Sequence, residues 1–279
     1  MKTISFYSYK GGVGRSAFLA SFAQWLINSG RSCVVLDGDL NAPSLHHKFL
    51  ESVILAKDVW DLNKQNVGLQ LYILDYLAKL NQAADDITEY FIPLNSNSSE
   101  INCFFMPAGN APTHDYASKH LRIDWKILFP PKDPAPGIDL FLDLRNRIEE
   151  EFNPDFLLVD LPAGITNIGV LGYAFLPDIS VCLFICSPEN LEGIRLAIDA
   201  LKNNVSKSPV IFPILSRVSR EQDEEAVIKA VKIWIAEDFR IIHESSGKEF
   251  AQPTIANPQP VAISSEYLEI FQIFKSGAK

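Results

Sequence analysis

The sequence has 279 residues, of which 47% are hydrophobic and 21% are charged, and its formal net charge is −9. This composition is typical of a globular protein with a sizeable core. The acidic balance excludes a protein that coats nucleic acid through bulk positive charge. A chain of this length forms one large domain or two small ones.

Short, continuously apolar runs alternate with longer amphipathic runs along the chain. Runs this apolar are typical of a parallel sheet that is covered on both faces. The alternation of strands and helices therefore predicts an α/β fold, a doubly wound and mostly parallel sheet with helices on both faces. We expect strands at 3–9, 33–37, 101–107, 155–160, 179–186 and 209–215, and helices at 15–29, 138–152, 167–175, 190–205 and 220–237.

The stretch from about 57 to 135 is less regular. It contains a polar segment, NSNSSE at 95–100, and a proline-rich segment, FPPKDPAPG at 129–137. We interpret these as surface loops of an irregular insertion within a single domain that spans 1–279. A division into two domains is the alternative.

The cysteines and the N-terminal residues indicate the cellular compartment of the protein. All four cysteines lie in apolar runs without a C-x-x-C pair, so we interpret them as buried and reduced rather than as metal ligands. MKTISFYSY runs directly into a glycine-rich loop without the features of a signal peptide, and no apolar run approaches the ~18–20 residues of a spanning helix. These features favour a cytoplasmic protein. The cysteines are Cys33, Cys103, Cys182 and Cys186.

A glycine-rich loop joins the first expected strand to the first expected helix. Glycines in this position let backbone N–H groups surround an anion, and the helix N-terminus adds partial positive charge. Ser16 places a hydroxyl where a phosphate-bound Mg²⁺ takes a ligand. The loop therefore predicts a nucleotide site, and a loop kept only for folding is the alternative. The residues predicted to bind the nucleotide here are Gly11, Gly12, Val13, Gly14, Arg15 and Ser16.

KGGVGRS at 10–16 resembles the deviant Walker A loop, K-G-G-x-G-K-[ST], of the ParA/MinD family of P-loop ATPases. Further motifs follow in the family's order. VVLDGDLNAPSL at 34–45 is similar to its D-x-D strand end, and FNPDFLLVDLPAGI at 152–165 is similar to its Walker B strand. INCFFMPAG at 101–109 and LPDISVCLFICSPENLEGI at 176–194 resemble the neighbouring strands. The motifs cover most of the chain outside the insertion.

The resemblance implies ATP and Mg²⁺ as cofactors and a role for each matching residue. Lys10 would reach across a homodimer interface to the partner's nucleotide, which couples dimerisation to nucleotide binding. Asp39 would orient the attacking water. Ser16, Asp39 and Asp160 would hold the Mg²⁺ ion, and Gly164 would sense the γ-phosphate. Asp37 is the strand-end partner of Asp39. The implied function is a weak ATPase switch that controls an unidentified partner protein.

Two positions depart from the family pattern. Arg15 stands where the family has lysine; it keeps the charge, but its planar group is bulkier and differently placed. We expect nucleotide binding to survive, and the alternative to an ATPase is a non-hydrolysing scaffold or sensor subunit, for example of a defence system. Ser216, followed by Arg217, stands where the family has an asparagine that contacts adenine, and a serine makes one such hydrogen bond where asparagine makes two.

Three other features have simpler interpretations. The apolar stripe Tyr267, Ile270, Phe271 and Phe274 fits a helix packed on the core better than a membrane-targeting helix, because its polar face carries glutamates rather than mostly bases. Basic residues near 217–232 alternate with acidic ones, so we expect neither nucleic acid nor membrane as a partner. We interpret His46 and His47 as a solvated pair, since adjacent side chains of a helix diverge and no third metal ligand is in sight.

Overall fold

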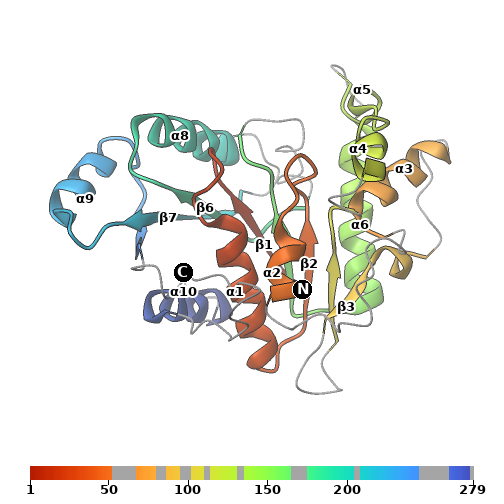
Figure 1. The fold of residues 1–279 in the computed structure, drawn as a ribbon, viewed down its shortest axis with the longest axis horizontal. Coiled ribbons are helices and arrows are strands. Elements are labelled where there is room, and N and C mark those ends of the chain that lie inside the picture. The colour runs from red at the N-terminus through yellow and green to blue at the C-terminus, as the bar shows by residue number, and fades with distance from the viewer. Residues whose placement is uncertain are drawn as a thin grey trace.

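The computed structural model of the chain describes residues 1–51, 67–79, 86–94, 102–109, 114–130, 135–164, 175–203, 208–244 and 264–276. Eight strands form one sheet in the spatial order β3-β4-β2-β5-β1-β6-β7-β8 (Figure 1). Every pair is parallel except β3 with β4. The strands are β1 (Lys2–Tyr7), β2 (Cys33–Asp37), β3 (Ile92–Leu94), β4 (Cys103–Met106), β5 (Phe156–Asp160), β6 (Ile179–Phe184), β7 (Val210–Val218) and β8 (Arg240–His243).

The six expected strands are confirmed, and the predicted α/β fold class with them. Four of the five expected helices are also confirmed; the fifth, at 167–175, lies almost entirely outside the described residues. The segment expected at 220–237 is helical only over α9 (Glu224–Lys232). Asp223 caps the start of this helix by accepting a hydrogen bond from the Ala226 N–H, which explains why the helix begins later than expected. The confirmed helices are α1 (Arg15–Asn28), α6 (Pro136–Phe152), α8 (Pro188–Asn203) and α9 (Glu224–Lys232).

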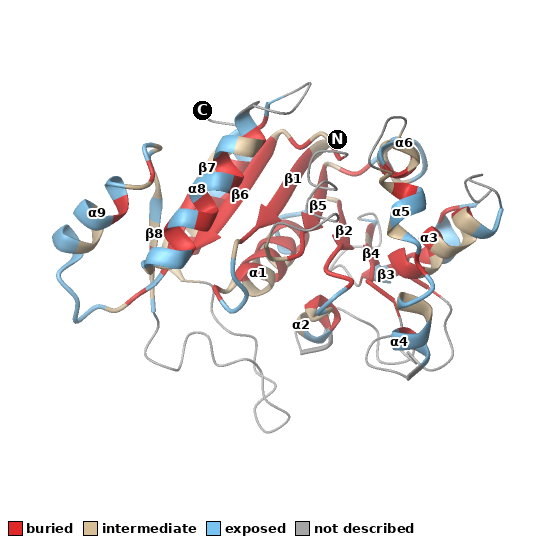
Figure 2. Ribbon diagram, turned by 90° about the horizontal axis from the view of Figure 1, so that it is seen from above, coloured by how far each residue is buried: buried red, intermediate tan, exposed pale blue. Residues whose placement is uncertain are grey.

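The core lies in two layers, one on each face of the sheet (Figure 2). Side chains of a strand alternate between faces, and β5 serves both. Its Phe156 and Leu158 pack in the layer that contains α1, whereas Leu157 and Val159 pack in the layer with α6 and α8. All residues of β2, β5 and β6 are buried, as expected for strands covered on both sides.

Regular elements occur between residues 57 and 135, where the sequence predicted one strand and otherwise loops. In this range β4 pairs with β2, and the short β3 adds an antiparallel edge. Leu69, Tyr72 and Ile73 of the first of its helices pack in the same core layer as α6. These elements extend one side of the main sheet (Figure 1). The helices here are α3 (Leu69–Ala78), η1 (Thr88–Tyr90), α4 (His114–His120) and α5 (Trp125–Leu128).

The C-terminal helix α10 (Ser265–Ser276) packs its apolar stripe into the core. Phe18 of α1 stacks edge-on against Tyr267 and Phe271, with ring centroids 4.7 and 5.3 Å apart. The Lys2 ammonium donates to the Phe274 carbonyl. The interpretation of this stripe as a core face is therefore confirmed. In the described part of the chain, no helix combines the length and apolarity that a bilayer crossing requires.

One cysteine differs from its expected environment. Cys33, Cys103 and Cys182 are buried, whereas Cys186 is exposed, and all four thiols are free. Cys186 lies two residues beyond the end of β6, where the chain has left the covered part of the sheet. The expectation that all four are buried is wrong at this position, because an apolar run can extend past the strand it predicts.

The two adjacent histidines separate into one buried and one exposed residue, which corrects the prediction of a solvated pair. They lie at the start of α2 (Leu45–Glu51), and the His46 ring is buried while His47 is exposed. Burial, and secondarily the proximity of His47, lowers the pKa of His46 from 6.5 to about 4. The folded state therefore binds fewer protons than the unfolded state between these two pH values.

We expect the free energy of unfolding to fall by about 2 kcal/mol between pH 7 and pH 5 through His46 alone, because only the unfolded state takes up its proton there. The substitution His46→Gln should remove this part of the pH dependence. Urea denaturation at both pH values measures it, with His47→Gln as the exposed neighbouring control. Equal pH dependence in the wild type and His46→Gln would contradict the assignment.

Candidate functional site

The glycine loop lies between β1 and α1, at the carboxyl edge of the sheet. Gly12 and Gly14 have φ angles of +79° and +92°, a backbone region in which residues with a side chain are strained. A Cβ added at Gly11, Gly12 or Gly14 would meet no atom within 4 Å in the described chain. Gly14 is the N-cap of α1, and no side chain of the described residues caps the helix. The first-turn amides are thus left for another acceptor, such as a phosphate.

Arg15, the first residue of α1, lies between two carboxylates. Its Nε donates to Asp160 Oδ1 at 2.6 Å and its Nη2 donates to Asp39 Oδ2 at 2.8 Å. Its Nη1 donates to Ser8 Oγ at 3.2 Å. The guanidinium is only 8% exposed and the Asp160 carboxylate 1%. The sheet brings these groups together, since Asp160 ends β5 and Asp39 follows β2, its neighbouring strand.

Burial and charge act against each other in this cluster. Burial lowers the pKa of Arg15, but attraction by Asp160 and Asp39 outweighs it, so the pKa is raised. Burial raises the pKa of Asp160 even though Arg15 and the Ser16 hydroxyl oppose it. The pKa of Asp37 is raised well above its ordinary value, first by burial and then by Asp160 and Asp39. Among the described residues, the cluster is thus an acidic site with one buried cation, Arg15.

The predicted metal residues Ser16, Asp39 and Asp160 are brought together, but their oxygens are already engaged. Ser16 Oγ donates to Asp160 Oδ2 at 2.7 Å, and the Ala42 N–H donates to Asp39 Oδ1 at 3.1 Å. With the two bonds from Arg15, all four carboxylate oxygens have a donor from the chain. Mg²⁺ requires near-octahedral oxygen ligands at 2.0–2.1 Å. The donor set as arranged here does not fit Mg²⁺ while Arg15 lies between the carboxylates.

Lys10 lies apart from this cluster. Its side chain is 49% exposed, its Nζ is 3.5 Å from Glu189 Oε2, and it lies 5.9 Å from the centre of the Tyr9 ring. Glu189 belongs to the first turn of α8, and the same helix carries Gly193, on which the Tyr9 ring packs. The beginning of the loop therefore rests on α8, while its end belongs to α1.

A Cβ added at Gly193 would overlap the Tyr9 ring. We therefore expect Gly193→Ala to destabilise the fold by about 1–3 kcal/mol through overpacking, although glycine-to-alanine changes inside helices ordinarily stabilise. In a Tyr9→Ala background the same change should stabilise. Urea denaturation of the four proteins measures this reversal of sign as a double-mutant cycle. A stabilising Gly193→Ala in the wild-type background would show that the ring does not rest there.

The residues predicted to contact the base and the γ-phosphate border the loop. Ser216 is buried in β7, where its Oγ donates to the Val13 carbonyl at 2.8 Å and lies 3.2 Å from the Phe184 carbonyl. It fastens the loop to the sheet, and Arg217 beside it has a φ of +58°. The Gly164 N–H donates to the Ser8 carbonyl at 3.2 Å. Contacts of Ser216, Arg217 and Gly164 with a nucleotide stay predictions.

Two residues of the site were not predicted. Ser8 contacts both Arg15 and Gly164, and the available signal was a small polar residue directly after an apolar strand. Glu189 pairs with Lys10, and no local pattern links residues this far apart in sequence. Among the described residues, no group of three or more His, Cys, Asp or Glu side chains is arranged to hold a metal ion.

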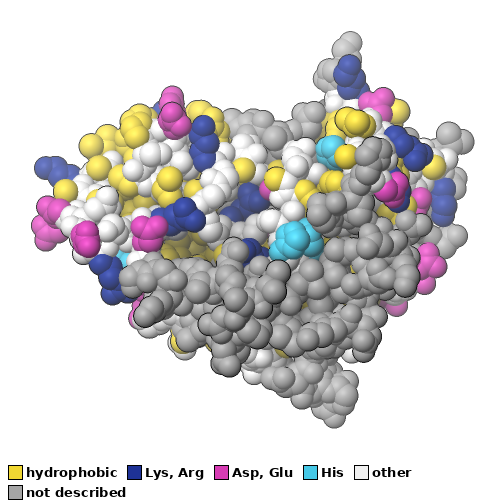
Figure 3. Space-filling view, viewed as in Figure 1, with side chains coloured by type: hydrophobic (Ala, Val, Ile, Leu, Met, Phe, Trp, Pro, Cys, Tyr) yellow, Lys and Arg dark blue, Asp and Glu magenta, His cyan; other side chains and the backbone are white. Residues whose placement is uncertain are grey.

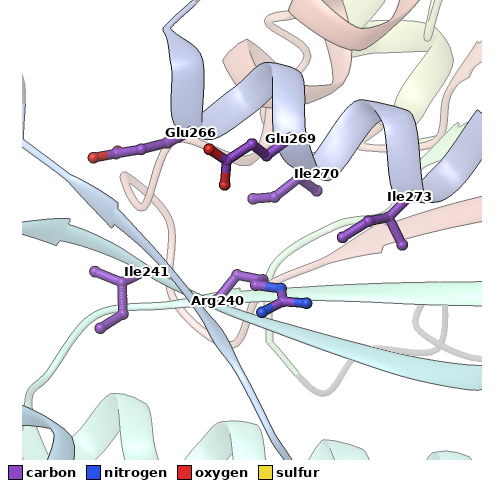
Figure 4. Close-up of a pocket in the computed structure, with 6 residues that line it drawn as sticks. All are labelled: Arg240, Ile241, Glu266, Glu269, Ile270 and Ile273. Atoms are coloured by element: carbon purple, nitrogen blue, oxygen red, sulfur yellow. The ribbon is translucent and has the colours of Figure 1, made fainter.

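A separate hollow of about 170 Å³ lies between β8 and α10 (Figure 4). None of its lining residues belongs to the glycine loop or to the acidic cluster, so it is not part of the candidate site. The lining residues are Arg240, Ile241, Glu266, Glu269, Ile270 and Ile273.

On the face shown in Figure 3, Lys and Arg side chains near α9 are interspersed with Asp and Glu side chains, in agreement with the mixed charges of this segment in the sequence.

Comparisons with known proteins agree with this architecture. The sequence matches no protein-family model. It is 23% identical over 252 residues to an uncharacterised ATP-binding protein of Methanocaldococcus jannaschii. This match covers 88% of this chain and 76% of that relative. The septum site-determining protein MinD from Pyrococcus horikoshii, complexed with Mg-ADP, is similar with a TM-score of 0.65 and 18% identity over 100% of this chain and 96% of its own.

A ParA family ATPase from Chlorobium tepidum is similar with a TM-score of 0.62 and 17% identity, over 98% of each chain. The fold is that of MinD and ParA. At these identities the similarity establishes the fold, and the chemistry of the site is argued from the residues of this chain.

Proposed function

We propose that this protein binds ATP at the glycine loop and works as a ParA/MinD-like nucleotide-dependent switch. The observation that carries the proposal is the open loop of Gly11, Gly12 and Gly14 at the uncapped start of α1. Backbone amides in this arrangement bind phosphate groups. The MinD structure with Mg-ADP and the ATP-binding relative, both similar along most of this chain, support the same ligand class.

The switch would operate through a homodimer that forms on nucleotide binding and acts on a partner protein. Lys10 is the residue that we expect to cross the interface, and its half-exposed side chain contacts an exposed carboxylate and the Tyr9 ring. Exposed ion pairs contribute little free energy, so a phosphate group of a second subunit's nucleotide could compete for this ammonium. Hydrolysis would complete the cycle, with Asp39 orienting the attacking water.

A second candidate is a non-hydrolysing nucleotide-binding module, such as a scaffold or sensor subunit. The observation that favours it is the hydrogen bond and ion pair from Arg15 to Asp39 at 2.8 Å. A carboxylate held in this way is less available to orient an attacking water. Equal ATP turnover in the wild type and an Asp39→Ala variant would favour the module, whereas a loss of turnover would favour the switch.

Isothermal titration calorimetry with ATP tests the binding proposal. We expect Gly12→Ala to weaken ATP binding at least about tenfold, because an alanine cannot hold the left-handed backbone without strain and the amides would move. Gly30→Ala is the matched control, since Gly30 also has a positive φ, +73°, but follows the end of α1. Absence of binding by the folded wild type, or equal loss in both variants, would refute the proposal.

Light scattering after size-exclusion chromatography tests the dimer. The expected result is a monomer in the apo state and with ADP, and a dimer with a non-hydrolysable ATP analogue. Lys10→Ala should prevent the dimer without preventing nucleotide binding. A monomer in all three states would leave ATP binding without the proposed switch.

A further inference from the structure

The guanidinium of Arg15 has the position and the contacts that a bridging cation would have. It joins the carboxylates of Asp39 and Asp160, which come from the ends of neighbouring strands, by bonds of 2.8 and 2.6 Å. Both carboxylates are buried, and burial of two like charges requires a compensating positive charge. In the described chain that charge is Arg15.

Arginine can serve in this way because of its shape. The guanidinium carries five N–H groups in a rigid plane and remains protonated in proteins. Three of its nitrogens donate to Asp160, Asp39 and Ser8, and its other two N–H groups have no acceptor among the described residues. A lysine ammonium is a compact point charge on a flexible stem, and it does not span two carboxylates with the same fixed geometry.

We infer that Arg15 replaces the divalent cation at the Asp39–Asp160 pair, so that this chain binds the phosphates of its nucleotide without requiring Mg²⁺. The loop amides would hold the phosphates, and the two uncommitted N–H groups of Arg15 would bridge from the carboxylates to a phosphate oxygen. A divalent cation at the same carboxylates would have to displace a buried guanidinium that donates three hydrogen bonds. The inference rests on the proposed ATP site and specifies its cofactor requirement.

The first test compares ATP binding by the wild type in EDTA and in Mg²⁺ at matched ionic strength, by calorimetry. We expect the dissociation constants to agree within about fivefold. A tightening of more than about fivefold by Mg²⁺ would overturn the inference. Binding in neither condition would refute the proposed ATP site, and the second test then decides the role of Arg15 separately.

The second test titrates Mn²⁺, a paramagnetic substitute for Mg²⁺, into the nucleotide-free protein and follows free Mn²⁺ by electron paramagnetic resonance. The wild type should bind no Mn²⁺ below about 1 mM. Arg15→Lys should bind one ion with a dissociation constant at least about tenfold below that limit. The double variant Arg15→Lys/Asp160→Asn should lose that gain. Binding by the wild type as tight as by Arg15→Lys would overturn the inference. Circular dichroism verifies that the variants are folded, and the calorimetric test needs no variant.

Discussion

Replacement of Arg15 by alanine is expected to lower the free energy of unfolding by about 3–5 kcal/mol, the cost of leaving buried charges without their partner. Arg15 is 8% exposed and Asp160 is 1% exposed, so water cannot solvate the remaining carboxylates without local opening. Urea denaturation at pH 8 measures the loss. Arg31→Ala is the matched control. Arg31 is also paired with aspartate, in its case Asp155 alone, but both side chains are substantially exposed, and such pairs contribute about 0–1 kcal/mol.

The loss should depend on pH in a defined direction. Burial already raises the pKa of Asp160, and Arg15 is the largest influence that lowers it. Without Arg15 the folded-state pKa rises further, and a carboxyl with a raised pKa favours the folded state when the pH falls through that value. We therefore expect the Arg15→Ala variant to recover part of its stability toward pH 5. A loss of similar size at pH 8 and pH 5 would mean that charge burial is not its cause.

Phe271→Ala is expected to lower the free energy of unfolding by about 3–5 kcal/mol, the range for truncating a fully buried aromatic side chain. The Phe271 ring lies 4.9 Å from that of Phe22 and 5.7 Å from that of Trp25, so its removal leaves a cavity where α10 meets α1. The exposed neighbour Gln272→Ala is the control and should change stability by less than about 0.5 kcal/mol. Urea denaturation measures both variants.

A membrane role for this helix predicts a different result. If α10 left the core to bind a bilayer, Phe271→Ala would reduce sedimentation with anionic lipid vesicles and leave the stability of the protein almost unchanged. The stability loss expected here follows from the burial of Tyr267, Ile270, Phe271 and Phe274 against α1. A loss below about 1 kcal/mol would be inconsistent with that burial.

Local sequence patterns were sufficient for much of the fold. Strands such as CVVLD and FLLVD are continuously apolar because both faces of a parallel sheet are covered, and that pattern is visible in a few consecutive residues. The two missed strands lie at the edges of the sheet. The strand β3 is only three residues long, and β8 is half exposed, so neither has a pattern that distinguishes it from a loop.

The phosphate loop was likewise predictable, since its glycines, its strand and its helix are adjacent in sequence. A positive φ at Gly12 and Gly14 is a local requirement, which only glycine meets without strain. Helices α3, α4 and α5 were not predicted. Their packing depends on distant partners, as in α3, whose Leu69 N–H bonds to the Pro107 carbonyl.

The state of Arg15 was decided only by the tertiary structure. The sequence determined that a cation follows the glycine loop and that carboxylates end two later strands, because each of these facts concerns neighbouring residues. It could not determine that Arg15, Asp39 and Asp160 meet in one buried network. Asp39 and Asp160 are 24 and 145 residues from Arg15 along the chain. The order β2-β5-β1 within the sheet sets the spatial distances among the three side chains. Side-chain contacts across that order arise from long-range packing, which a local pattern does not encode.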